Sequence, residues 1–141
     1  MALTTRQDIL AEIVYRMGLV TAIATATGRR DTDNQPYDPD DCPAVNVSFG
    51  PDTVDENISQ DDHHLTIKLE LFTSSRSGDD TAEDLFAALA DVIIANSTWG
   101  GHADGSSSPS PDTSDIYQVG DIISTGTLNF IVHYTTDKGK I

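Results

Sequence analysis

Apolar and polar residues alternate along three stretches of the chain, and a period of two is typical of β-strands with one buried face. The clearest stretch is residues 65–71, Leu-Thr-Ile-Lys-Leu-Glu-Leu, after which Phe72 falls on the polar side. Residues 45–49 and 128–134 show the same alternation. A less regular run over 19–27, rich in Val, Ile and Thr, favours a further strand, although its alanines also permit helix.

Two other stretches carry apolar residues at helical spacing. Thr4 and Gln7 have the spacing of a capping box, and apolar residues follow at positions 9, 10, 13, 14 and 17, which predicts a helix over about 5–18. Apolar positions 82, 85, 86, 89, 92 and 93 predict a second helix over about 80–96. This order of elements predicts an α+β fold over 1–141: a single domain whose mostly antiparallel, mixed sheet carries both helices on one face.

Long polar segments separate these elements. Residues 28–42 contain Pro36, Pro39 and several aspartates, which disfavour regular structure. Residues 50–62 are acidic, and residues 100–114 have neither period nor bulk. We therefore expect flexible loops at about 28–42, 50–62 and 100–114.

The formal charge of -15, from 8 basic and 23 acidic residues, is unevenly distributed. Residues 31–62 hold ten Asp or Glu and no Lys or Arg, and residues 81–121 hold seven more and again none. Such a surface repels phosphate backbones, because duplex binding needs cations to displace counterions. The sequence thus argues against specific nucleic-acid binding, and without a signal peptide or a long apolar run we expect a soluble, cytoplasmic chain.

Few residues form a pattern that points to catalysis or to a bound cofactor. His63 and His64 follow two aspartates, but neighbouring residues on a strand point to opposite faces and converge poorly on one metal ion. Residues 31–42 resemble a calcium loop without its sixth-position glycine and twelfth-position glutamate, so weak divalent-ion binding stays open. Cys42 stands alone, and no G-x-S-x-G motif is present. We predict no enzyme activity, no cofactor and no dedicated metal site.

Three strand segments together resemble one known family. They are Asp-Asp-Cys-Pro-Ala-Val-Asn-Val at 40–47, His-Leu-Thr-Ile-Lys-Leu-Glu-Leu-Phe at 64–72 and Leu-Asn-Phe-Ile-Val-His-Tyr at 128–134. In this order, with a helix at each matching place, the chain is similar to the tail terminator proteins of long-tailed bacteriophages, the family of the phage lambda minor tail protein U. It departs from that family in its longer insert at 100–114 and its Asp-rich loop.

The resemblance implies a structural role in a virion. Such proteins form a ring, usually a hexamer, that caps the tail tube at its head-proximal end, stops tube polymerisation and offers a surface to the neck or head-completion proteins. The implied partners are other copies of the chain, the tail tube protein and the neck proteins, with no membrane. Candidate contact residues are Arg6, Arg16, Arg29, Arg30, Asp40, Asp41, His102 and Asp104. Pro43 and the aspartates before it are interpreted as protection of an exposed strand edge.

Two alternative functions remain open from the sequence. The first is another ring-forming neck or head-completion protein. The second is a small cytoplasmic enzyme or metal-binding protein that uses the aspartates and histidines. Overlong tail tubes in particles that lack the protein would indicate a terminator, and tight stoichiometric metal binding would favour the second alternative.

Overall fold

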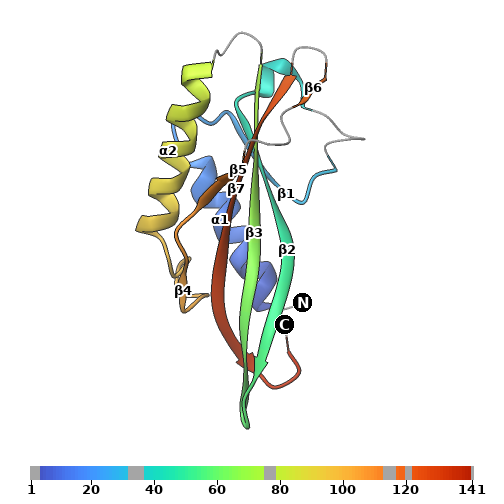
Figure 1. Ribbon diagram of the computed structural model, residues 1–141, viewed down its shortest axis with the longest axis vertical. Coiled ribbons are helices and arrows are strands. Elements are labelled where there is room, and N and C mark those ends of the chain that lie inside the picture. The colour runs from blue at the N-terminus through green and yellow to red at the C-terminus, as the bar shows by residue number, and fades with distance from the viewer. Residues whose placement is uncertain (1–3, 32–36, 75–78, 113–116, 120–121, 141) are drawn as a thin grey trace.

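The computed structural model describes residues 4–31, 37–74, 79–112, 117–119 and 122–140. Two α-helices, a 3-10 helix and a seven-stranded sheet make up the fold (Figure 1). In chain order the elements are α1 (Thr5–Gly18), β1 (Thr25–Gly28), η1 (Pro39–Asp41), β2 (Ala44–Glu56), β3 (Gln60–Ser74), α2 (Asp79–Ala95), β4 (Gly105–Ser106), β5 (Ser110–Asp112), β6 (Tyr117–Val119) and β7 (Ile122–Asp137).

The sheet is mixed but mostly antiparallel. Its strand order is β1-β2-β3-β7-β4, and β5 and β6 also pair with β7. Among the strand pairs that the described residues form, only β1–β2 is parallel. Both helices lie on one face of this sheet (Figure 1), so the predicted α+β class is confirmed. Neither described helix has the length and apolar character that crossing a membrane requires.

The core lies between the helices and the inward faces of the three long strands. Register places Val45 opposite Leu71, and Leu69 opposite both Val47 and Leu128, so the alternating residues of β2, β3 and β7 form continuous apolar rows. These rows are buried against apolar side chains of both helices: Ile9, Leu10, Ile13, Met17, Leu85, Leu89 and Ile93. The apolar residues that alternate along the strands and those at helical spacing in the two helices therefore form one core.

Both predicted helices are present close to their expected bounds. Thr4 caps α1 as predicted: its side chain accepts a hydrogen bond from the backbone N–H of Gln7, and the Gln7 side chain accepts one from the backbone N–H of Thr4. The predicted strand at 19–27 is mostly wrong, because residues 19–24 form turns and only Thr25–Gly28 pairs with β2. Since β1 is a short edge strand, its residues show little alternation.

The predicted loop at 50–62 is instead the far part of a long hairpin. β2 continues to Glu56 and β3 starts at Gln60, so this hairpin projects beyond both helices (Figure 1). No helix covers its end, and both faces of the two strands can therefore be polar. The residues of this hairpin end therefore lack the alternation of apolar and polar positions that identifies a strand in a sequence.

The predicted flexible loop at 100–114 also contains ordered structure. β4 and β5 pair with β7, and the turn before them buries Trp99, whose Nε1 donates to Ser106 Oγ at 2.8 Å. These strands are too short to show a period, and they are held by the free edge of β7. In the predicted loop at 28–42, the described residues include η1 and the buried Tyr37, and residues 32–36 lie outside the described part of the chain.

The interpretation of Pro43 as protection of an exposed strand edge is wrong. Its carbonyl accepts hydrogen bonds from the N–H groups of Ala24 and Thr25, so β1 already covers this end of β2. Phe72 does point to the face opposite the helices, as expected, yet it is buried because Tyr37 packs on it with ring centroids 5.2 Å apart.

Candidate interaction surfaces

A β-bulge in β2 turns one acidic residue toward the core. Phe49 pairs with Ile67, but the next paired residue is Asp52 with Leu65, so β2 contains one extra residue at Gly50-Pro51. Because side chains alternate between faces, this insertion moves Asp52 from the outer to the inner face. The Asp52 side chain is 10% exposed there, at the end of the sheet near the start of α1.

Asp52 is the centre of a polar cluster. Its Oδ2 accepts hydrogen bonds from Arg6 Nη2 and from the Tyr134 hydroxyl at 3.2 Å, and it lies 3.0 Å from His63 Nδ1. His63 stacks on Tyr134 with ring centroids 4.4 Å apart, and its Nε2 lies 2.9 Å from Thr136 Oγ1. We call Arg6, Asp52, His63, Tyr134 and Thr136 the Asp52 cluster.

The electrostatics of the Asp52 cluster favour a fixed structural role. Burial raises the pKa of Tyr134, an effect that the Arg6 hydrogen bond partly offsets. Burial by itself lowers the pKa of Arg6, but its interactions with Tyr134 and Asp52 outweigh this and raise it. Arg6 thus remains a cation, and its head group is committed to a carboxylate of its own chain. As a predicted intersubunit contact, Arg6 is poorly placed.

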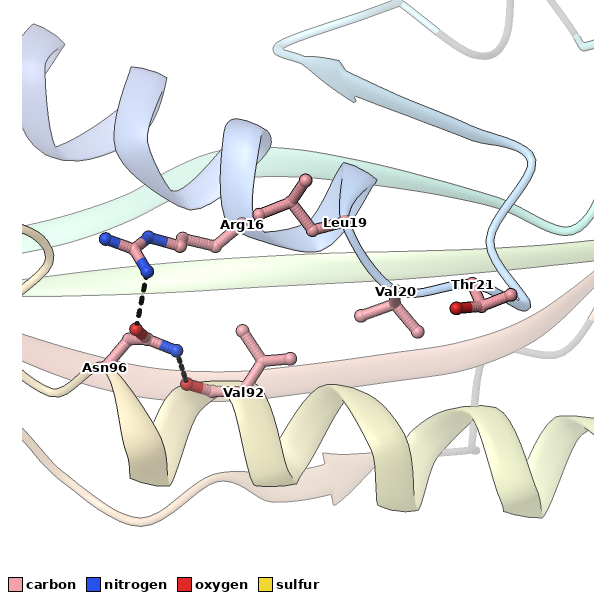
Figure 2. Close-up of a pocket in the computed structure, with 6 residues that line it drawn as sticks. All are labelled: Arg16, Leu19, Val20, Thr21, Val92 and Asn96. Atoms are coloured by element: carbon pink, nitrogen blue, oxygen red, sulfur yellow. Dashed lines mark hydrogen bonds between the residues drawn. The ribbon is translucent and has the colours of Figure 1, made fainter.

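Arg16 lines a groove between the end of α1 and α2 (Figure 2). The groove has a volume of about 330 Å³ and is also lined by Leu19, Val20, Thr21, Val92 and Asn96. Arg16 donates to Glu12 at 2.7 Å and to Asn96 Oδ1 at 3.0 Å, so it holds the two helices together. Leu19 remains 60% exposed at the rim, and the lining of the groove mixes polar and apolar side chains.

Arg29 lies beside a second groove, between α1 and β1. This groove has a volume of about 420 Å³ and is lined by Gln7, Leu10, Ala11, Val14, Gly28 and Arg29. The Arg29 guanidinium lies 5.3 Å from the centre of the Phe49 ring, and Arg6 lies 5.6 Å from the same ring. Within the described residues no carboxylate pairs with Arg29, so its charge is available to a partner. We call this the α1–β1 groove.

Arg30 belongs to a different surface, near the 3-10 helix. Its guanidinium lies 4.5 Å from the centre of the Tyr37 ring, while its backbone groups bond the side chain of the buried Asn46. Burial raises the pKa of Tyr37, whose hydroxyl bonds Thr27. Arg29 and Arg30 are both candidate contact residues and are neighbours in the chain, but the structure gives them separate surroundings.

The predicted acidic contacts Asp40 and Asp41 are exposed in η1. Cys42 follows them and is half-buried against Tyr37, Ala44 and Phe72, where it packs as a small apolar residue. Burial, and then the charge of Asp41, raise the pKa of the Cys42 thiol.

His102 and Asp104 lie at the exposed turn before β4. Asp104 Oδ2 accepts a hydrogen bond from Thr135 Oγ1 at 2.7 Å, and its backbone N–H donates to the His133 carbonyl. His64 lies on the same sheet face as His133, with ring centroids 4.6 Å apart, while His63 points to the opposite face, as expected for neighbours on a strand. Among the described residues, no group of three or more metal-ligating side chains is arranged to hold an ion.

The candidate residues chosen from the sequence do not include Ile58, which is fully exposed. It stands in the turn between β2 and β3 and is 100% exposed. Asp55, Glu56 and Asp62 lie on the adjoining strand ends. A large apolar residue between the acidic residues of 50–62 is the signal that could have identified this projecting tip.

The chain matches no protein-family model and no curated protein sequence. Among solved structures, it is similar to a chain described as "Virion of native gene transfer agent (GTA) particle". The two are 15% identical, the match covers 95% of this chain and 92% of that chain, and the TM-score is 0.37. The function is therefore inferred from the residues and surfaces of this chain itself.

Proposed function

We propose that this chain is a structural protein of a phage-like virion, which assembles into a ring on the end of the tail tube. In this role it stops tube polymerisation and offers its outer face to the neck or head-completion proteins. The proposal includes a hexameric ring at the head-proximal end of the tail and no catalytic step. It starts from the resemblance of three segments to tail terminator proteins.

One observation carries the proposal. The strand residues of the three segments that resemble the terminator family lie next to one another in the sheet: 44–47 in β2, 64–72 in β3 and 128–134 in β7. Their register is continuous, since Val47 pairs with Leu69 and Leu69 pairs with Leu128. Segments that match by chance would have no reason to form one hydrogen-bonded unit at the centre of the sheet.

The surfaces of the chain also favour self-association. Two grooves that each contain an arginine lie beside α1, one of mixed lining and one mainly apolar, and an acidic hairpin with an exposed isoleucine projects from the far end. Because these features differ in shape and charge, contacts between unlike surfaces of neighbouring copies would produce rings or filaments. The Asp52 cluster, in contrast, is an internal support.

Electron microscopy of particles assembled without the protein tests the proposal. We expect tail tubes of uncontrolled length, and tails of normal length after the protein is supplied again. Tails of normal length joined to empty or leaking heads would contradict the terminator role and indicate a neck protein. Deletion of 100–114 is a poor test, because it removes β4, β5 and the Ser106 partner of the buried Trp99.

A further inference from the structure

The α1–β1 groove is open because of a glycine. A side chain at Gly28 would point into the groove, where its Cβ would lie 3.3 Å from Val14 Cγ2 and 3.5 Å from Leu10 Cδ2. The groove thus has a floor formed by aliphatic side chains and a rim that carries Arg29. An occupant with an aliphatic group next to a carboxylate would match both parts.

The tip of the β2–β3 hairpin has this combination. Ile58 is completely exposed, and a fully exposed β-branched side chain at the end of a projecting hairpin makes no contribution to its own core. Asp55, Glu56 and Asp62 supply negative charge on both arms, and Asp55 is 72% exposed. Lys138 donates to the carbonyl of Asn57 at 3.0 Å, so carboxylates outnumber this cation near the tip.

We propose that the hairpin tip of one copy docks in the α1–β1 groove of the next copy, with Ile58 on Leu10 and Val14 and with Asp55 or Glu56 facing Arg29. Charge complementarity selects this partner, because Arg29 lacks a carboxylate in the described part of its own chain. The inference rests on the proposed ring function and identifies the surfaces that would join its subunits.

The proposed contact joins two copies of the chain. The hairpin end lies beyond the start of α1 and points out of the molecule (Figure 1). The groove, in contrast, lies between α1 and β1. Tip and groove are different surfaces, so each copy offers one of each, and successive copies can join head to tail until the ring closes.

Strand addition is a poor alternative at this position. Among the described residues, β1 covers only residues 44–47 of β2, and the edge from Ser48 to Glu56 has no neighbouring strand. This edge carries the Gly50-Pro51 bulge, a proline without a backbone N–H, and acidic residues, all of which prevent pairing with another strand. Docking through side chains at the tip and the groove therefore fits better than extension of the sheet.

The first test uses the purified full chain in sedimentation experiments over a concentration series. Ile58→Asp and Arg29→Glu are each expected to weaken association at least about tenfold, as for residues central to an interface. Ile94→Asp is the matched control, because Ile94 is a 66% exposed apolar residue on α2, away from both surfaces. Circular dichroism at the same concentrations checks that each variant folds.

The second test mixes the two defective variants. Ile58→Asp keeps an intact groove and Arg29→Glu keeps an intact tip, so the mixture can form one good contact but no second one. We expect a one-to-one complex that does not grow, whereas each variant alone stays monomeric. If the mixture associates as weakly as each variant alone, the inference is overturned. It is also overturned if the unaltered chain forms no multimers at any soluble concentration or salt.

The third test uses chemical cross-linking to detect contact between the hairpin tip and the α1–β1 groove. In a Cys42→Ser background, Ile58→Cys is mixed with Val14→Cys and treated with a short bismaleimide linker. A covalent heterodimer is expected, and Ile94→Cys should replace Ile58→Cys without forming one. Multimers that form but show no 58–14 link would overturn this docking while leaving the ring function standing. Normal tails without the protein would remove the function while leaving the docking result intact.

Discussion

Asp52 shows how a single residue can take a role that its sequence position hides. In a strict alternation it belongs to the polar face, and the charge pattern places it in an acidic loop. One additional residue in β2 turns Asp52 inward, where its carboxylate accepts hydrogen bonds from Arg6 and Tyr134 and lies beside the His63 ring. Sequence reasoning therefore singled out Arg6 and His63, but for other roles, and it missed the carboxylate that joins them.

We predict that Asp52→Asn destabilises the chain strongly. The change removes the negative charge that compensates the partly buried Arg6, and breaking such a pair from one side costs about 3 kcal/mol. Urea unfolding followed by circular dichroism measures the loss. Asp55→Asn on the same strand is the control: its carboxylate is exposed and, among the described residues, forms an ion pair with His64 alone, so we expect a change within about 0.5 kcal/mol. Equal effects of the two substitutions would contradict a structural role for the Asp52 cluster.

The raised pKa of Tyr134 leads us to predict that the folded chain loses stability at alkaline pH. Burial raises its pKa in the folded chain, while in the unfolded chain the pKa of a tyrosine is about 10. The folded state therefore holds the phenol proton more tightly. Its contribution to the free energy of unfolding is complete below about pH 10 and is lost as the pH rises from there through the folded pKa.

Burial also raises the pKa of Tyr37, so both phenols act in the same direction. Urea unfolding at a series of alkaline pH values should show a falling free energy of unfolding, and Tyr134→Phe should make that fall smaller. A variant with the same alkaline slope as the unaltered chain would show that the Tyr134 hydroxyl contributes nothing to it.

At the scale of elements, the sequence was informative where an element borders the core. Residues 65–71 alternate because α1 and α2 cover one face of β3, and α1 is predicted closely because its cap and its apolar stripe agree. Prediction failed for strands that the core does not cover. The hairpin end has no covered face, and β4 and β5 depend on hydrogen bonds to β7, whose partners a local pattern cannot identify.

The bulge in β2 gives a prediction about an element. Deletion of Pro51 removes the extra residue, so that Gly50 alone lies opposite Thr66 and Asp52 stays opposite Leu65 on the inner face. We therefore expect the Asp52 cluster to be kept and the urea midpoint to change little. Deletion of Ser59 also shortens the hairpin by one residue, in the exposed turn, and should change the midpoint by a similar small amount. A much larger loss for the Pro51 deletion than for the Ser59 deletion would show that the extra residue itself, and not the pairing on each side of it, holds Asp52 inward.

At the scale of the whole molecule, the distribution of charge was readable from the sequence but its spatial meaning was not. From the sequence, four arginines are candidate contact residues for partners. Arg6 and Arg16 instead bind carboxylates of their own chain, and Arg30 lies on Tyr37, so Arg29 best retains the predicted role. Tertiary neighbours decide which cations are available, and no local pattern contains them.

The net charge predicts how assembly responds to salt. Each copy carries a formal charge of -15, so a ring accumulates repulsion between all its members, whereas each contact gains only a local attraction near Arg29. Added salt screens both, with a Debye length of about 10 Å at 0.1 M, but the longer-range repulsion is lost first. We therefore expect multimers to increase as salt is raised from low ionic strength, and Glu83→Gln on α2, which removes one negative charge per copy outside the tip, to shift this rise to lower salt. Light scattering across a salt series measures both, with Glu56→Gln as a comparison of equal charge change at the tip, where the weakened contact to Arg29 should make the shift smaller. If multimers decreased steadily with salt in all three proteins, local ion pairs would dominate and net repulsion would not limit assembly.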